Sequence, residues 1–120
     1  MKNIGNEKLE LLTNCEELVA IIIWDSYPDQ LSLTEIMQKV NSRFNKEWKP
    51  QTVSTFLARL VTKGYLSSYR QGRVFYYIPD ITKETYASIK LAEYCELYGI
   101  PSKEDLKKCI SHLKTKRVPH

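Results

Sequence analysis

A helix followed directly by a basic hairpin, between residues 46 and 80, constrains the fold of this 120-residue chain most strongly. Pro50 suits the first position of a helix, because its fixed φ fits and its missing N–H would have no partner there. Gly64 lies where a helix commonly ends in the left-handed conformation. Between them, apolar side chains recur at i, i+3, i+4, i+7 and i+8, which is one face of a helix. These residues are Val53, Phe56, Leu57, Leu60 and Val61.

Two segments rich in Tyr, Val, Phe and Ile follow the glycine, at residues 65–70 and 73–79. Gln71-Gly72 lies between them and is expected to form a two-residue hairpin turn. Arg70 and Arg73 would then flank this turn, where two guanidinium groups at the tip of a hairpin can reach a phosphate backbone. The segment therefore predicts the second half of a winged helix-turn-helix.

Two capping boxes mark helices upstream of this segment. Thr13 with Glu16 opens the first, which Tyr27-Pro28 ends, and Ser32 with Glu35 opens the second. The first helix is expected to be the central one and to bury Leu18, Ile21, Ile22 and Trp24. The second is expected to bury Leu33, Ile36, Met37, Val40 and Phe44.

The second helix and the Pro50 helix would form the helix-turn-helix, with residues 46–49 as the turn. Trp48 lies in this turn. We interpret its side chain as a plug against the core, and a contact beside a phosphate is the alternative.

Two more helices are predicted after the hairpin. Thr82 can cap one at residues 83–98, which Gly99 ends, and Ser102 with Asp105 opens the other. Their apolar side chains need a surface to pack against, either the same domain or a second chain. We expect a second chain, because two-fold protein symmetry matches a palindromic DNA site. The predicted dimerisation residues are Tyr86, Ile89, Leu91, Tyr94, Cys95, Tyr98, Leu106, Ile110 and Leu113.

The predicted fold class is therefore mainly α with a small β-wing. A winged helix-turn-helix domain is expected at residues 10–80, followed by a C-terminal helical dimerisation segment at residues 81–120.

Basic side chains are concentrated in the predicted helix-turn-helix and hairpin. The net charge of the chain is only +4, but residues 39–73 hold eight basic side chains and one acidic one, Glu47. Such a distribution is typical of a protein that binds a polyanion. The polar face of the Pro50 helix carries small hydrogen-bonding side chains, which suit close approach to base edges. We expect base contacts from Gln51, Thr52, Ser54 and Thr55, and phosphate contacts from Lys49, Arg59, Arg70 and Arg73.

Other functional classes receive little support from the sequence. Cys15, Cys95 and Cys109 are an odd number of cysteines without close spacing, which argues against a disulfide framework or a zinc site. Cys109 and His112 share a helix face, and we interpret them as a buried thiol and a surface imidazole instead of a metal pair. Both histidines lie near the C-terminus and the four glycines are isolated, so we predict neither an enzyme nor a cofactor.

No apolar run reaches 18 residues, and the first residues lack the features of a secretory signal. We therefore expect a cytoplasmic protein without a membrane partner.

The chain also resembles the penicillinase repressor (BlaI/MecI/CopY) family of winged-helix transcription factors. The resemblance runs through about residues 12–85 and lies in an ordered series of short motifs. They are Leu12-Thr13, Glu16, Trp24, Trp48, Thr52-Val53, Thr55, Arg59-Leu60-Val61, Lys63-Gly64-Tyr65-Leu66 and Gly72-Arg73. It implies a homodimeric repressor of transcription on a palindromic operator in double-stranded DNA.

The resemblance further implies regulation in response to antibiotics, with a membrane sensor protease as partner and derepression by proteolysis. In that family the cleaved bond is Asn-Phe, and residues 81–120 contain neither residue. Copper-sensing relatives use Cys-x-Cys pairs, which this chain also lacks. The inducing signal is therefore left open. The alternative function is a winged-helix module that binds proteins, which would expose an apolar patch on the Pro50 helix.

Overall fold

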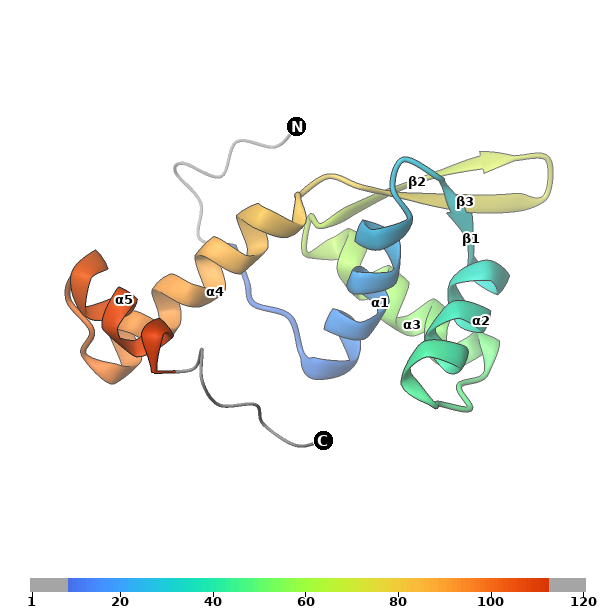
Figure 1. The fold of residues 1–120 in the computed structure, drawn as a ribbon. Coiled ribbons are helices and arrows are strands. Elements are labelled where there is room, and N and C mark those ends of the chain that lie inside the picture. Colours follow the sequence, from blue (N-terminus) through green and yellow to red (C-terminus); the bar gives the residue numbers. More distant parts are fainter. Residues whose placement is uncertain (1–8, 113–120) are drawn as a thin grey trace. The chain divides into compact units, whose positions relative to one another are not determined.

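The computed structural model describes residues 9–112 (Figure 1). The chain divides into two compact units after Tyr86, called unit 1 and unit 2. The described elements are α1 (Asn14–Ser26), β1 (Leu31–Ser32), α2 (Leu33–Phe44), α3 (Pro50–Thr62), β2 (Leu66–Gln71), β3 (Val74–Pro79), α4 (Lys83–Tyr98) and α5 (Lys103–Ser111). The first unit holds α1 to β3 and the first turn of α4, and it is a winged helix. The predicted fold class is thereby confirmed.

The helices begin where their capping residues predicted. Thr13 Oγ1 accepts from the Glu16 N–H at 3.3 Å, and the Glu16 carboxylate accepts from the Thr13 N–H at 2.9 Å. The same reciprocal box opens α2 at Ser32, and α3 begins at Pro50 without a side-chain cap. Local sequence is sufficient here, because a cap satisfies backbone donors within one turn.

The turn between α2 and α3 is fixed by one side chain. Asn41 Nδ2 donates to the Trp48 carbonyl at 3.1 Å, and the Trp48 N–H donates to Asn41 Oδ1 at 2.9 Å. Asn45 ends α2 in the left-handed conformation, with φ of 56°. The half-buried indole of Trp48 packs on Phe56, with ring centroids 5.1 Å apart. Trp48 is therefore the predicted plug, and the turn sets how α3 leaves α2.

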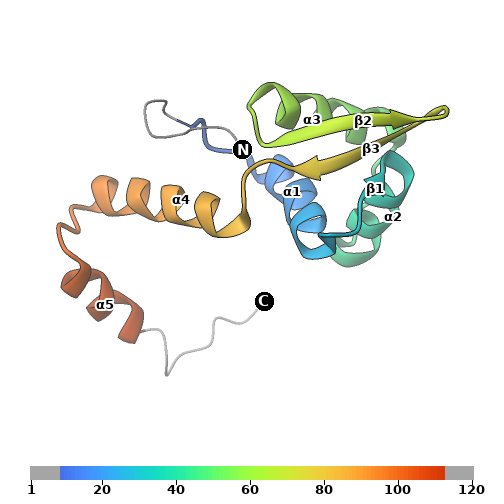
Figure 2. The same ribbon diagram turned by 90° about the horizontal axis from the view of Figure 1, so that it is seen from above.

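The sheet has three antiparallel strands in the order β1-β3-β2, and Figure 2 shows β3 between the other two. The two-residue β1 was not predicted, because so short a strand has no periodic pattern. The hairpin turn lies one residue later in the chain than the predicted Gln71-Gly72. Gln71 pairs with Val74, so the turn is Gly72-Arg73. Gly72 has φ of 67°, and the first position of a two-residue turn requires this conformation.

The core of unit 1 lies between the three helices and the sheet. Its fully buried side chains include Val19, Ile23, Ile36, Val40, Val53, Leu57, Leu60 and Tyr65. The predicted buried face of α1 was partly wrong. Val19, Ala20 and Ile23 are buried together with Ile22, whereas Leu18, Ile21 and Trp24 are half-buried. Residues 18–24 are apolar throughout, so periodicity alone could not choose a face.

Tyr86 belongs to this core and not to an exposed dimerisation face. Its side chain is 5% exposed and packs against the rings of Trp24 and Tyr65, with centroids 5.6 and 5.5 Å away. Its hydroxyl donates to Glu17 Oε2 at 2.5 Å and accepts from the Leu12 N–H at 3.2 Å. Burial raises the pKa of Tyr86 far above its ordinary value, which keeps this donor protonated. The predicted role of Tyr86 is corrected accordingly.

The second unit contains the rest of α4 and α5, separated by Gly99 at φ of 68°. Leu91, Tyr94, Leu97, Tyr98 and Ile110 are all exposed, and Leu97 has the largest exposed fraction, 75%. Ile89, Cys95 and Leu106 are half-buried. Leu113 was also predicted at the dimer interface and lies outside the described residues. Cys109 is exposed, which corrects the prediction of a buried thiol.

Candidate nucleic-acid interface

An open groove of about 790 Å³ runs between α3 and the β2–β3 hairpin in unit 1. Three segments that are far apart in the sequence meet along it: the start of α2, the outer face of α3 and the hairpin. Its lining residues are Ser32, Leu33, Thr34, Ser54, Ala58, Val61, Thr62, Ser68, Arg73, Val74, Phe75 and Tyr77. Most are small, hydroxyl-bearing or apolar, and Arg73 carries the charge. The groove can therefore admit a partner close to the helix backbone.

The side chains predicted to contact bases all reach the surface of α3. Gln51 is exposed, and Thr52, Ser54 and Thr55 are half-exposed. Ser54 lines the groove, whereas the other three lie on α3 beyond the groove lining. Thr55 Oγ1 donates to the Gln51 carbonyl at 3.0 Å, so its hydroxyl hydrogen is already used. Thr55 consequently offers a partner an acceptor and a methyl group.

The side chains predicted to contact phosphates are exposed, and none forms an ion pair within residues 9–112. Lys49 is the N-cap residue of α3, and Arg59 lies with its guanidinium carbon 5.9 Å from the Phe56 ring centroid. Arg70 Nε donates to the Gly72 carbonyl at 2.8 Å, and its guanidinium carbon lies 5.8 Å from the Phe75 ring centroid. These contacts orient cationic groups and leave their charge unpaired.

Two other basic side chains of the region are paired with acids. Lys63 Nζ lies 2.7 Å from Glu16 Oε1, and Glu16 is 1% exposed. Burial alone would raise the pKa of Glu16, but hydrogen bonds from Lys63 and from the Thr13 N–H hold it below its usual range. Arg43 pairs with Asp25 at 2.5 Å on the surface. Lys63 thus stabilises the fold, and Arg73 is the basic side chain that lines the groove.

Sequence reasoning missed the apolar part of the groove. Val61 was placed on the buried face of α3, but it is 37% exposed and lines the groove. At 100° per residue, position i+8 lies about 80° away from position i, so Val61 turns away from the core that Val53, Leu57 and Leu60 enter. Ala58 adds a second methyl group to this surface. Val74 and Phe75 face the groove from the hairpin and are 41% and 49% exposed.

Residues 9–112 also bear on metal binding and membrane insertion. In this range no three His, Cys, Asp or Glu side chains gather where they could hold a metal ion. None of the helices in the same range is long and apolar enough to cross a membrane.

The family model for the penicillinase repressor matches residues 12–116, which is most of the chain. The chain belongs to the penicillinase repressor family. A penicillinase repressor from Bacillus licheniformis is 30% identical over 84 residues, which cover 70% of this chain and 62% of that protein. The chain therefore matches less than two thirds of the length of this family member.

Two solved structures from the family share the fold at 30% sequence identity. One is the solution structure of the DNA-binding domain of the repressor BlaI, with a TM-score of 0.54 over 72% of this chain and 94% of that one. The other is the monomeric form of Bacillus licheniformis BlaI in complex with the blaP half-operator, with a TM-score of 0.52 over 66% of this chain and 92% of that one.

Proposed function

We propose that this protein is a transcriptional repressor that binds operator DNA through the groove and the exposed face of α3. The observation that carries the proposal is that α3 and the hairpin, which form the groove, expose polar side chains together with cationic side chains that form no ion pair within residues 9–112. Membership of the penicillinase repressor family supports it. So does the half-operator complex of BlaI, a relative with the same fold.

In this proposal α3 enters the major groove of DNA, which has the width of an α-helix. Gln51 presents an amide that can donate and accept, and Thr52 and Ser54 present hydroxyls. Ala58 and Val61 present methyl groups that can contact thymine. The cationic side chains of α3 and the hairpin hold phosphates, which position the protein without carrying sequence information. They are Lys49, Arg59, Arg70 and Arg73.

The active form in this proposal is a homodimer on a palindromic operator. Leu91, Tyr94, Leu97 and Tyr98 are exposed along one helix, α4, and Ile110 is exposed on α5. Soluble monomers seldom expose so many large apolar side chains on neighbouring segments. Pairing these helices with those of a second chain would bury them and would place two copies of α3 on two half-sites. We further propose that the regulated genes respond to antibiotics, as the family membership suggests.

A second candidate is a module that docks onto another protein. The apolar strip that Ala58 and Val61 form with Val74 and Phe75 favours it, because an exposed apolar surface on α3 is what such a module requires. The cationic side chains around the strip favour DNA, since a protein partner would need matching acidic groups.

Salt dependence separates the two candidates. If each of the four cationic side chains of a protomer contacts one phosphate, a dimer displaces the counterions of about eight phosphates. The logarithm of the association constant should then fall against the logarithm of salt concentration with a slope of about −7. Fluorescence anisotropy with a labelled operator duplex measures this slope. A slope near zero would refute DNA binding through this surface.

Arg73→Ala, in the groove, is the test variant. Arg43→Ala, outside the groove, is its matched control. Both replace an arginine on unit 1, but Arg43 is paired with Asp25 and does not line the groove. Arg73→Ala should reduce the magnitude of the slope by about 2 in a dimer, because one phosphate contact is lost per protomer. Arg43→Ala should leave the slope unchanged.

A further inference from the structure

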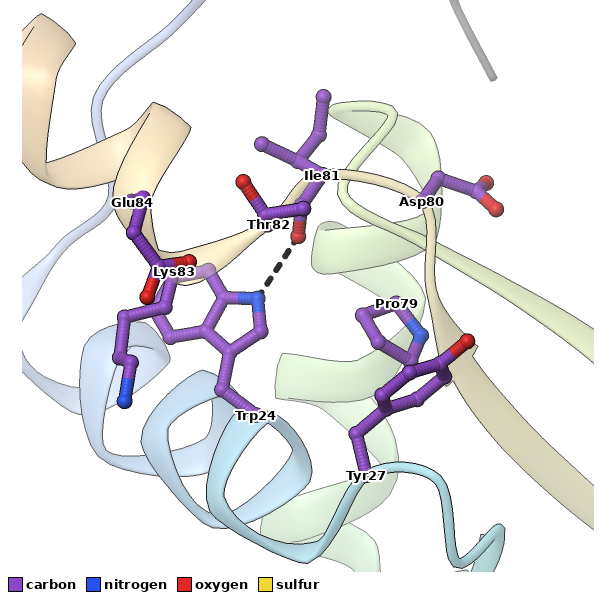
Figure 3. Close-up of a pocket in the computed structure, with 8 residues that line it drawn as sticks. All are labelled: Trp24, Tyr27, Pro79, Asp80, Ile81, Thr82, Lys83 and Glu84. Carbon is purple, nitrogen blue, oxygen red and sulfur yellow. Dashed lines mark hydrogen bonds between the residues drawn. The ribbon is translucent and has the colours of Figure 1, made fainter.

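A separate pocket of about 470 Å³ lies in unit 1 where α1 and β3 end and α4 begins (Figure 3). None of its lining residues lines the groove between α3 and the hairpin. Its volume falls within the range of about 300–1,000 Å³ that is common for small-molecule sites. The pocket is therefore large enough for a ligand of its own.

Two aromatic side chains, Trp24 and Tyr27, form part of the walls of this pocket. Figure 3 shows the Trp24 indole on one side and the neighbouring rings of Tyr27 and Pro79 on the other. Trp24 Nε1 donates to the Ile81 carbonyl at 2.8 Å, and the indole packs on Tyr86. Its orientation is thus fixed and its only donor is already used. Tyr27 is 60% exposed, so its ring remains accessible to a ligand.

The charge of the pocket is negative on balance. Asp80, Lys83 and Glu84 line it. Lys83 Nζ lies 3.8 Å from Asp25, outside the lining, which offsets part of its positive charge. Asp80 accepts a hydrogen bond from Ser67 Oγ at 2.5 Å, which holds the carboxylate in place. Aromatic ring faces attract cations, and nearby carboxylates strengthen that attraction.

We propose that this pocket binds a small organic cation, an amine or a quaternary ammonium compound with an apolar body. The rings of Trp24 and Tyr27 contact the ligand, and Glu84 supplies the opposite charge. The site is separate from the groove, since the two share no lining residue.

The first test uses benzyltrimethylammonium as the probe and phenylacetate as its anionic counterpart. The chain has two tryptophans, so Trp48→Phe in the full-length protein leaves Trp24 as the only fluorescent indole. Benzyltrimethylammonium should change Trp24 fluorescence saturably, and phenylacetate should bind at least about tenfold more weakly. Calorimetric titration of the unsubstituted protein gives the same comparison without any substitution. Equal affinity for both probes, or no saturation by either, would overturn the proposal.

The second test exploits two neighbouring residues of opposite charge. Glu84→Gln should weaken binding of the cation about fivefold, which corresponds to ~1 kcal/mol. Lys83→Gln should strengthen it, and Asp25 keeps its partner Arg43 in that variant. Tyr27→Ala should weaken it, whereas Tyr98→Ala, which removes an exposed tyrosine outside the pocket, should not. If Glu84→Gln and Lys83→Gln leave the affinity unchanged, or if Tyr98→Ala alone weakens it, the cation does not bind at this pocket.

Discussion

The last residue that a C-terminal truncation retains should decide whether the winged helix still folds. Sequence analysis placed the domain boundary at residue 80, but Ile81 and Tyr86 are 3% and 5% exposed and belong to the core of unit 1. We compare a protein ending at Asp80 with one ending at Lys90. The longer one keeps both core side chains and loses α5 and most of the exposed apolar surface of α4.

The expected difference follows from large core side chains. Removing a buried isoleucine side chain costs about 2–5 kcal/mol, and removing a buried aromatic one costs about 3–5 kcal/mol. The shorter protein also lacks the Ile81 carbonyl that accepts from Trp24 and the Tyr86 hydroxyl that bonds to Glu17. The combined loss of about 5–10 kcal/mol matches the whole free energy of unfolding of a typical domain. The protein ending at Asp80 should therefore be largely unfolded.

Urea unfolding followed by far-UV circular dichroism measures this difference. The protein ending at Lys90 should unfold cooperatively, and the one ending at Asp80 should show no cooperative transition at 25 °C. Tyr86→Phe in the longer protein is the matched control, because it keeps the ring and removes the hydroxyl, at a cost of about 1–2 kcal/mol. Equal urea midpoints for the two truncated proteins would refute the assignment of Ile81 and Tyr86 to the core.

Lys63→Ala should lower the free energy of unfolding at neutral pH by about 3 kcal/mol, because it leaves the buried Glu16 carboxylate unpaired. Folding lowers the pKa of Glu16, so the pair stabilises the protein above the ordinary carboxyl pKa of 4.5; the difference from the parent should shrink as pH falls through the lower, folded-state pKa. Thr52→Ala should relax the preference among operator variants in a gel-shift competition, whereas Arg73→Ala should weaken binding to all of them alike. Leu97→Asp should make the protein monomeric in light scattering and lower operator affinity about a hundredfold, with half-site binding retained; a dimer of this variant with parental affinity would exclude α4 from the interface.

Local sequence determined the beginnings of the helices and the order of the elements. Thr13 and Ser32 cap their helices within one turn, and Pro50 starts α3, so neighbouring residues contain the whole signal. The winged-helix fold could be predicted for the same reason, since a helix-turn-helix followed by a hairpin is a sequential pattern. The predicted DNA-contacting side chains do lie at the surface, because the opposite face of α3 is the one whose spacing fits a buried stripe.

The three-dimensional fold alone decided which surfaces face each other. The apolar run in α1 fits more than one buried face, and only packing against α2 and α3 selects Val19 and Ile23. In the sequence Lys63 is one more basic residue of the helix-turn-helix region. Its acidic partner Glu16 lies 47 positions earlier in the chain, so only the fold shows that the two are paired. Tyr86 has the spacing of an interface residue, yet it fills the space beside Trp24. Periodicity describes one element at a time, whereas burial and ion pairing depend on elements that meet only after the chain has folded.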